Sequence, residues 1–190
     1  MKYLFFVILS LLFNNPLHAK KLIISEIKNK IENVDIYGNK FILNKNYIIK
    51  NGDFFKSKNQ NSYFVFNNIK ICLAKNSSVK FKEIKSKNFI LEHITGNVLV
   101  NKIKNKSLKV EISIYKKFIF DVKDKVYINQ FNKNKFIVRS FFGLSYKQFY
   151  SKQIFKLKNN TEYKYDAKLK ETKVSNILKN PVIVNCLTNK

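Results

Sequence analysis

Polar and apolar residues alternate in short runs along most of the chain. In KVEISIY at 109–115, Val110, Ile112 and Ile114 alternate with other side chains, and a repeat of two residues places alternate side chains on opposite faces of a β-strand. Such a strand buries one face and exposes the other to water. Strands are expected at 40–43, 47–49, 63–66, 70–74, 79–84, 89–94, 98–103, 108–114, 118–122, 125–131, 135–141, 154–157 and 163–165.

Clusters of turn-forming residues, among them KNGD, KNQNS, KNSS, TGN and KNNT, separate these runs. Short strands at spacings of roughly 8–12 residues, with turns between them, are typical of an all-β sandwich or barrel. The chain has four Gly residues, so we expect Asn, which tolerates left-handed backbone angles, at many turns. The sequence predicts a mainly β fold, a single sandwich or jellyroll-like domain of many short antiparallel strands.

Two segments fit a helix as well as other structures. In 21–34, four aliphatic residues have helical spacing, namely Ile24, Ile27, Ile31 and Val34. A helix in 168–179 would have to end before Pro181. Either segment could equally be coil or a further strand. We divide the chain beyond residue 19 into an N-terminal segment at 20–39, a β domain at 40–165 and a C-terminal tail at 166–190.

The first 19 residues differ from the rest. They hold Lys2, an apolar run of 11 residues from Tyr3 to Phe13, and a polar stretch that ends at Ala19. A helix needs roughly 20 apolar residues to span a bilayer, whereas this layout is typical of a cleavable secretory signal peptide. We therefore expect a signal peptide at 1–19 and a periplasmic or secreted mature chain. An uncleaved anchor and a buried core strand are the alternatives.

The chain is strongly basic. Its formal net charge is +25, or +24 without residues 1–19, which carry one Lys and no acid. So much Lys attracts anionic surfaces, but the Lys residues are spread along the chain, and Arg139 is its one Arg, the residue better suited to hold phosphate. The abundance of Lys, Asn, Ile and Phe also fits AT-rich codons. The sequence leaves open whether the charge serves a polyanion site or reflects codon usage.

Aromatic and basic residues alternate in FFKSK and FIVRSFFG, as they do in proteins that bind single-stranded nucleic acid. However, the chain has 18 Phe residues, more than one exposed platform needs. Most of them must form the core, because so many exposed rings would cause aggregation. Since the chain is also expected to be exported, we expect no nucleic-acid partner.

The chain contains two cysteines, Cys72 and Cys186. In an exported protein they can form a disulfide, which would add about 4–5 kcal/mol to the free energy of unfolding in the chain-entropy model. The alternative is two buried thiols that pack as small hydrophobic side chains. The sequence after residue 19 has one His and no close Cys pair, so we expect no metal site.

Residues that could carry catalysis are few. His93 and Glu92 are neighbours in FILEHI, but neighbours in a strand point to opposite faces, so they should not form a base and its orienting carboxylate. The sequence has neither Gly-x-Ser-x-Gly nor a Gly-rich phosphate loop. Four acids without paired spacing are Asp53, Asp121, Asp124 and Asp166. We expect neither catalysis nor a cofactor, and an envelope hydrolase that uses His93 is the weakest alternative.

Turn residues in 51–101 follow a recognisable order. They are Gly52 and Asp53, Ser57, Ser62, Asn67 and Asn68, Asn76 and Ser77, then Gly96 with Val98. Gly permits positive φ, and Asn, Asp and Ser bond their own backbone. This order resembles the FecR-like periplasmic domain, with an Asn-Asn turn in place of an acidic Gly turn. The resemblance implies an exported binding or regulatory β domain without catalytic residues. We expect a stand-alone form, without the sigma-factor-binding segment and membrane span of the family's regulators.

Two kinds of partner follow from these patterns. A regulatory module would meet a protein of the cell envelope through an exposed strand edge or loop surface. The alternative is an anionic-lipid or lipopolysaccharide carrier, because TGNVLV at 95–100 is similar to turns of the open β-jellyrolls of lipopolysaccharide transport. A carrier requires an apolar cavity that is open at one end, whereas a protein-binding module requires a filled core.

Overall fold

The computed structural model describes residues 21–103, 108–132, 134–141, 144–148, 153–166, 168 and 171–176. Every regular element in these residues is a β-strand, which confirms the mainly β prediction. The strands are β1 Leu22–Lys28, β2 Glu32–Val34, β3 Lys40–Ile42, β4 Ile48–Ile49, β5 Phe54–Lys56, β6 Ser62–Phe66, β7 Ile69–Leu73, β8 Ser78–Ile84, β9 Asn88–Thr95, β10 Asn97–Lys102, β11 Lys109–Ile114, β12 Phe118–Val122, β13 Lys125–Asn132, β14 Lys135–Ser140, β15 Leu144–Gln148, β16 Ile154–Leu157, β17 Thr161–Asp166 and β18 Glu171–Asn176.

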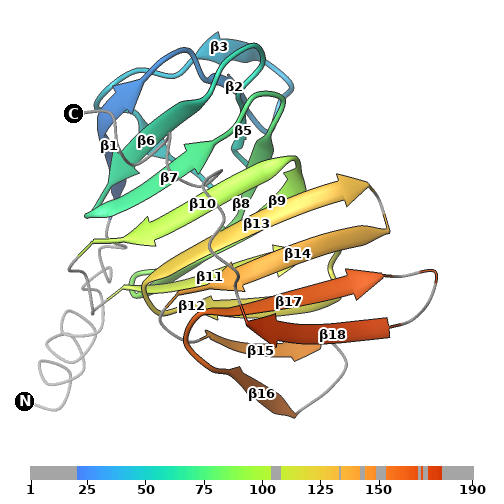
Figure 1. The fold of residues 1–190 in the computed structure, drawn as a ribbon. Helices are drawn as coiled ribbons and strands as arrows, with labels where there is room; N and C mark the ends of the chain where they lie inside the picture. The colour runs from blue at the N-terminus through green and yellow to red at the C-terminus, as the bar shows by residue number, and fades with distance from the viewer. Residues whose placement is uncertain are drawn as a thin grey trace, which may run out of the picture.

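Two nine-stranded sheets lie one behind the other as a sandwich (Figure 1). Sheet 1 has the order β18-β17-β14-β13-β10-β7-β6-β1-β4, and sheet 2 has the order β16-β15-β12-β11-β9-β8-β5-β2-β3. From β5 onwards the chain mostly places two consecutive strands in one sheet and then crosses to the other. Since neither order closes on itself, each sheet has two edge strands, β18 and β4 in sheet 1 and β16 and β3 in sheet 2.

The strand pairs are antiparallel with one exception, β9 and β11, which run parallel from Lys109 opposite Asn88 to Ile114 opposite His93. Between them the chain crosses to sheet 1 as β10 and returns. This single intervening strand reverses the chain direction twice, so β11 re-enters sheet 2 in the direction of β9. The parallel pair is therefore a consequence of the crossing pattern.

Aromatic rings join the two sheets along the whole sandwich. The pairs that connect sheet 2 to sheet 1 are Phe55–Phe64, Phe81–Phe66, Phe118–Phe136 and Tyr146–Tyr163, with ring centroids 5.1, 5.7, 5.4 and 4.8 Å apart. Most of these side chains are fully buried. Burial of one Phe side chain contributes roughly 1.5–3 kcal/mol, so the described interior is a filled core that holds the sheets together.

Asparagine occupies most of the left-handed turn positions in the described residues, as the scarcity of Gly predicts. Positive φ angles occur at Asn29, Asn46, Asn67, Asn68, Asn76 and Asn160. Asn67 and Asn68 form the two-residue loop between β6 and β7, with φ angles of 44° and 59°. Positive φ at both loop residues matches the right-handed twist of a hairpin, so this turn needs no glycine.

The segment 21–34 contains strands, one of the three structures that its sequence allows. Leu22 and Ile24 alternate with exposed residues in β1, and Ile24 lies opposite Phe66 of β6. Cross-sheet burial of these side chains outweighs the helical spacing of the same residues. The β structure therefore begins before residue 40, and β18 continues it beyond residue 165. The signal-peptide prediction for residues 1–19 concerns residues outside those described.

Candidate functional site

Asp53, the acid of the family-like turn, holds the loop between β4 and β5. Its Oδ2 accepts hydrogen bonds from the Lys50 backbone N–H at 2.8 Å and from the Tyr47 hydroxyl at 3.0 Å. Burial raises the pKa of Asp53, and burial together with the bond to Asp53 raises the pKa of Tyr47 to about 12. Gly52 has a φ angle of +91° and lies close to Ile36: a Cβ added at Gly52 would be 2.3 Å from Ile36 Cγ2.

The serines of the same motif meet in one buried cluster. Ser57 and Ser62 lie with their Oγ atoms 3.2 Å apart, and Ser62 donates to the Lys30 carbonyl at 3.2 Å. The Ser57 N–H donates to the Ser77 carbonyl at 3.0 Å. All three serines are buried. The structure therefore brings together residues that the sequence shows only as separate turns.

Gly96 completes this cluster on the side of β10. It has φ +78°, and an added Cβ would lie 2.3 Å from Ser77 Oγ, which accepts a hydrogen bond from the Asn97 N–H at 2.8 Å. Asn76, in the turn before Ser77, has a positive φ and donates its N–H to the Lys58 carbonyl at 3.1 Å. These motif residues fix turns and strand ends, and the hydrogen bonds described for them are made to other groups of the same chain.

His93 is a buried structural residue. It is 3% exposed, its Nε2 lies 2.9 Å from the Gly96 carbonyl oxygen, and burial lowers its pKa to about 4. Its Nδ1 has no hydrogen-bond partner in the described residues. Glu92 lies opposite Lys80 on the other face of β9 and is half-buried. The paired carboxylate that a hydrolase using His93 requires is therefore not supplied by Glu92.

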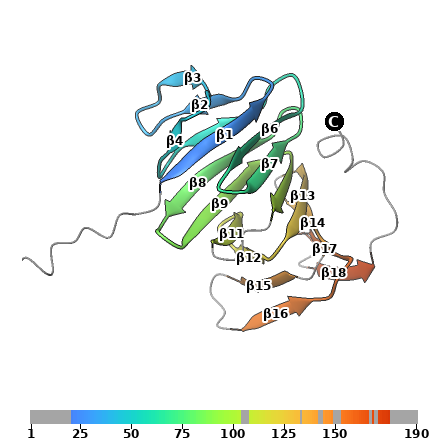
Figure 2. The ribbon, with the colours of Figure 1, turned by 90° about the vertical axis from the view of Figure 1, so that its left-hand side faces the viewer.

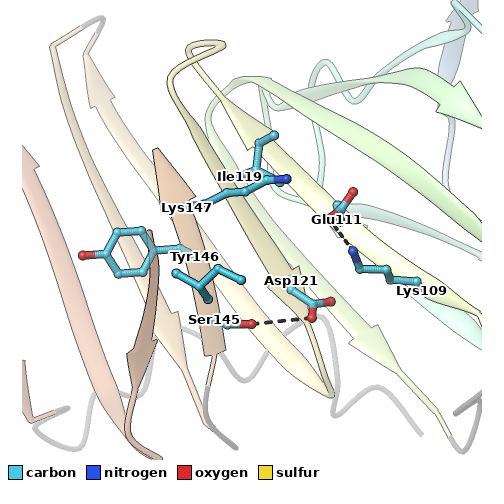
Figure 3. A pocket seen from close by; sticks show the side chains of 8 residues that line it. Lys109, Glu111, Ile119, Asp121, Ser145, Tyr146 and Lys147 are labelled. Carbon is cyan, nitrogen blue, oxygen red and sulfur yellow. Dashed lines mark hydrogen bonds and ion pairs between the residues drawn. The ribbon is translucent and has the colours of Figure 1, made fainter. Parts of the chain in front are cut away.

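A shallow polar pocket lies on the outer face of sheet 2, over β11, β12, β15 and β16 (Figure 3). Glu111 is bonded to Lys109 at 2.7 Å, and Ser145 Oγ lies 3.5 Å from Asp121 Oδ2. The volume is about 100 Å³, below the roughly 300–1,000 Å³ of typical small-molecule sites. Its eight lining residues include no His that could act with Ser145 as a base. Of the four charged residues that line this pocket, Lys109 and Glu111 form an ion pair.

The described residues also form neither a metal-ligand cluster nor a membrane-spanning element of helical type. No three side chains of His, Cys, Asp or Glu gather there as metal ligands would. The described part of the chain likewise holds no helix of the length and hydropathy needed to cross a bilayer.

The largest exposed hydrophobic side chains concentrate at one end of the sandwich. Of the eight in the described residues, five belong to 23–48, and we call them the apolar end: Ile23, Ile36, Tyr37, Ile42 and Ile48, exposed by 42, 64, 83, 46 and 39%. Figure 2 shows β2, β3 and β4 together, away from β16 and β18. The edge strands β3 and β4 lie here, and edge strands carry unpaired N–H and C=O groups.

A hollow of about 210 Å³ lies within the apolar end. Ile36 and Tyr37 line it together with Tyr47, Lys50 and Asp53. Asp53 is 1% exposed, and its Oδ1 has no hydrogen-bond partner in the described residues. The hollow therefore has an exposed apolar rim beside a buried carboxyl group. No sequence pattern predicts this arrangement, because the residues named come from three different loops.

Two solved structures have a similar fold. Both are crystal structures of a "putative anti-sigma factor" from Parabacteroides distasonis ATCC 8503. One has a TM-score of 0.57 at 11% identity and covers 70% of this chain, and the other has a TM-score of 0.55 at 9% identity and covers 65%. The chain spans 64% and 59% of their lengths, respectively. No family model and no curated protein matches the chain. At these identities the likeness shows that the β-sandwich fold is shared.

Proposed function

We propose that the chain is a non-catalytic regulatory β domain of FecR type, which is exported and binds a protein of the cell envelope. Three observations support this proposal. The fold is shared with two structures described as anti-sigma factors, which are regulators. The family-like turn residues Gly52, Asp53, Ser62, Asn76, Ser77 and Gly96 hold strand ends together. His93 is buried and bonded to backbone.

The apolar end is the observation that carries the proposal. Exposed hydrophobic side chains lie there beside two sheet edges, with Ile23 and Ile48 on the outer face of sheet 1 and Ile42 on the outer face of sheet 2. Exposed hydrophobic side chains at one end of a molecule are of the kind that protein partners cover. An extended segment of a partner can pair with the edge of β3 or β4. A side chain of the same partner can enter the hollow between Ile36 and Tyr37, beside the buried Asp53. Burial of the apolar rim would then strengthen the hydrogen bonds that Asp53 already accepts from Tyr47 and Lys50 by excluding water.

The lipid-carrier alternative receives less support. A carrier would need the inner faces of the two sheets to stand apart, but rings from both sheets are in contact from Phe55–Phe64 at one end to Tyr146–Tyr163 at the other. An acyl chain would have to displace these rings. The shallow pocket on the outer face of sheet 2 is lined mainly by charged and polar residues, which do not suit an acyl chain.

Affinity capture tests the protein-binding function. The mature chain 20–190 is used to capture proteins from its own cell envelope, with a wash at low salt and another at about 0.5 M, where exposed charges are screened within a few Å. The variants are Tyr37→Ser with Ile42→Ser, and the matched control is Ile154→Ser, which is 64% exposed on β16.

We expect a discrete protein that survives the salt wash with the wild type and the control, and that is lost with the double variant. Capture of that protein by the wild type, the control and the double variant would show that the binding surface lies outside the apolar end. Capture of anionic lipid alone, or of nothing at high salt, would contradict the proposed function.

A further inference from the structure

The outer face of sheet 1 carries a second apolar cluster, separate from the core. Cys72, Leu99 and Tyr127 form it, with Tyr63 and Phe141 packed against them. In β7, β10 and β13 the flanking residues point into the core, so these three side chains point outward by the alternation of a strand. They are nevertheless only 2, 3 and 6% exposed.

The cluster belongs to a continuous row of side chains across sheet 1. Each residue of the row lies opposite the next on the neighbouring strand: Tyr63, Cys72, Leu99, Tyr127, Arg139, Glu162 and Ser175. Arg139 and Glu162 are ion-paired, with side chains 12 and 9% exposed. The row thus stays shielded from water over most of the width of the sheet.

The described strands do not cover this row. All eighteen belong to the two sheets, and sheet 2 packs against the opposite face of sheet 1 (Figure 1). A sheet face open to water would expose large side chains such as Leu99 and Tyr127. Moreover, Cys72, within the row, is disulfide-bonded.

We infer that the C-terminal segment 177–190 crosses the outer face of sheet 1 along this row and is joined to it by a disulfide between Cys72 and Cys186. Cys186 is the other cysteine of the chain, and it lies outside the described residues. The bond forms when the two thiols transfer two electrons and two protons, by thiol–disulfide exchange, to a disulfide-bearing oxidant of the oxidising compartment.

The length of the chain fits this path. β18 ends at Asn176, ten residues before Cys186, and an extended chain covers about 33 Å in ten residues. From β18 to β7 the sheet order has five steps, which amount to about 24 Å at roughly 4.8 Å each. Ser175 already lies in the row, so the segment starts in line with Cys72.

The tail sequence has the matching pattern. In an extended segment Val182 and Val184 share a face with Cys186, and Ile183 and Asn185 point the other way. Two residues span about 6.8 Å and one strand spacing about 4.8 Å, which places Val184 above the contact of Leu99 with Tyr127. The apolar cluster then packs against an apolar tail face.

Peptide mapping of the oxidised mature chain tests the covalent part. After digestion without reductant, we expect one linked peptide that joins Cys72 to Cys186 within a single chain. Disulfide-linked dimers, or two free thiols in the protein isolated from the cell envelope, would overturn the inference.

A matched pair of tail variants tests the path across the row. In a glutathione buffer, Val184→Asp should lower the equilibrium constant for the Cys72–Cys186 bond about tenfold, the value of one buried Val side chain. Asn185→Asp adds the same charge on the other face and should leave that constant nearly unchanged. Equal effects of the two substitutions on this constant would overturn the proposed path of the tail. Neither result depends on the protein partner proposed above.

Discussion

At the residue scale, glycine and asparagine have different tasks in this chain. Asn tolerates the left-handed angles of most turns, including both loop positions between β6 and β7. Gly96 is needed for a second reason, since its missing Cβ leaves room for Ser77. This close contact lets Ser77 Oγ accept the Asn97 N–H and so ties the turn before β8 to the start of β10.

We predict that Gly96→Ala lowers the free energy of unfolding by about 2–4 kcal/mol, because strain at positive φ adds to a clash with the Ser77 backbone. Gly38→Ala is the matched control: φ is +85° there, but nothing lies within 4 Å of an added Cβ, so it should cost about 1 kcal/mol. Urea unfolding of the three chains measures both. Equal losses would mean that Ser77 yields to the added methyl group.

At the scale of elements, the turn between β9 and β10 depends on a histidine that must remain neutral. His93 of β9 is bonded to the Gly96 carbonyl, which also accepts the Gln130 N–H of β13 at 3.2 Å. The Gly96 carbonyl therefore links β9 of sheet 2 and β13 of sheet 1 through the turn that follows β9. Burial lowers the pKa of His93 to about 4, so protonation of His93 destabilises this packing.

The pKa difference predicts loss of stability in acid. An unfolded His has a pKa of about 6.5, so below this pH the unfolded state binds more protons than the folded state. The contribution of His93 is complete above about pH 6.5 and falls by about 3 kcal/mol as the pH falls to 4. His93→Gln, which keeps a donor for Gly96, should remove this part of the pH dependence.

Urea unfolding of wild type and His93→Gln between pH 7 and pH 4 checks this expectation, because the carboxyl groups titrate in both proteins and cancel in the comparison. If the free energy of unfolding had the same pH dependence in both proteins, protonation of His93 would not destabilise the folded state, and the prediction would be wrong.

At the scale of the whole molecule, charge opposes the compact state. The chain has 37 basic and 12 acidic residues, so most Lys residues have no acid to pair with. The described ion pairs involve mostly Lys with exposed side chains, and such pairs contribute roughly 0–1 kcal/mol each. Self-repulsion of the remaining charge should therefore outweigh them.

We expect added salt to stabilise the folded protein. Raising NaCl from about 10 mM to about 150 mM shortens the Debye length from about 30 Å to about 8 Å, and the urea midpoint of the oxidised chain should rise. KCl at the same concentration is the control for ion-specific effects. A midpoint that falls with both salts would show that the ion pairs stabilise the fold more than the excess charge destabilises it.

The sequence alone determined most of the strands and turns of this protein. Alternation with a period of two residues, and Asn or Gly between the runs, are local properties, so β10, β11 and the turn at Asn67 and Asn68 could be predicted. The structure of segment 21–34 could not be predicted, because the spacing of its isoleucines fits a helix as well as short strands. Its pairing with β6 decides between them.

Tertiary structure alone decided which side chains meet. The gathering of Ser57, Ser62 and Ser77, the grouping of five exposed hydrophobic residues at the apolar end, and the row that contains Cys72 all arise from pairing between distant strands. A repeat of two residues shows which side chains of one strand lie on the same face of the sheet. The neighbours on that face depend on the order of strands in each sheet, which long-range packing determines.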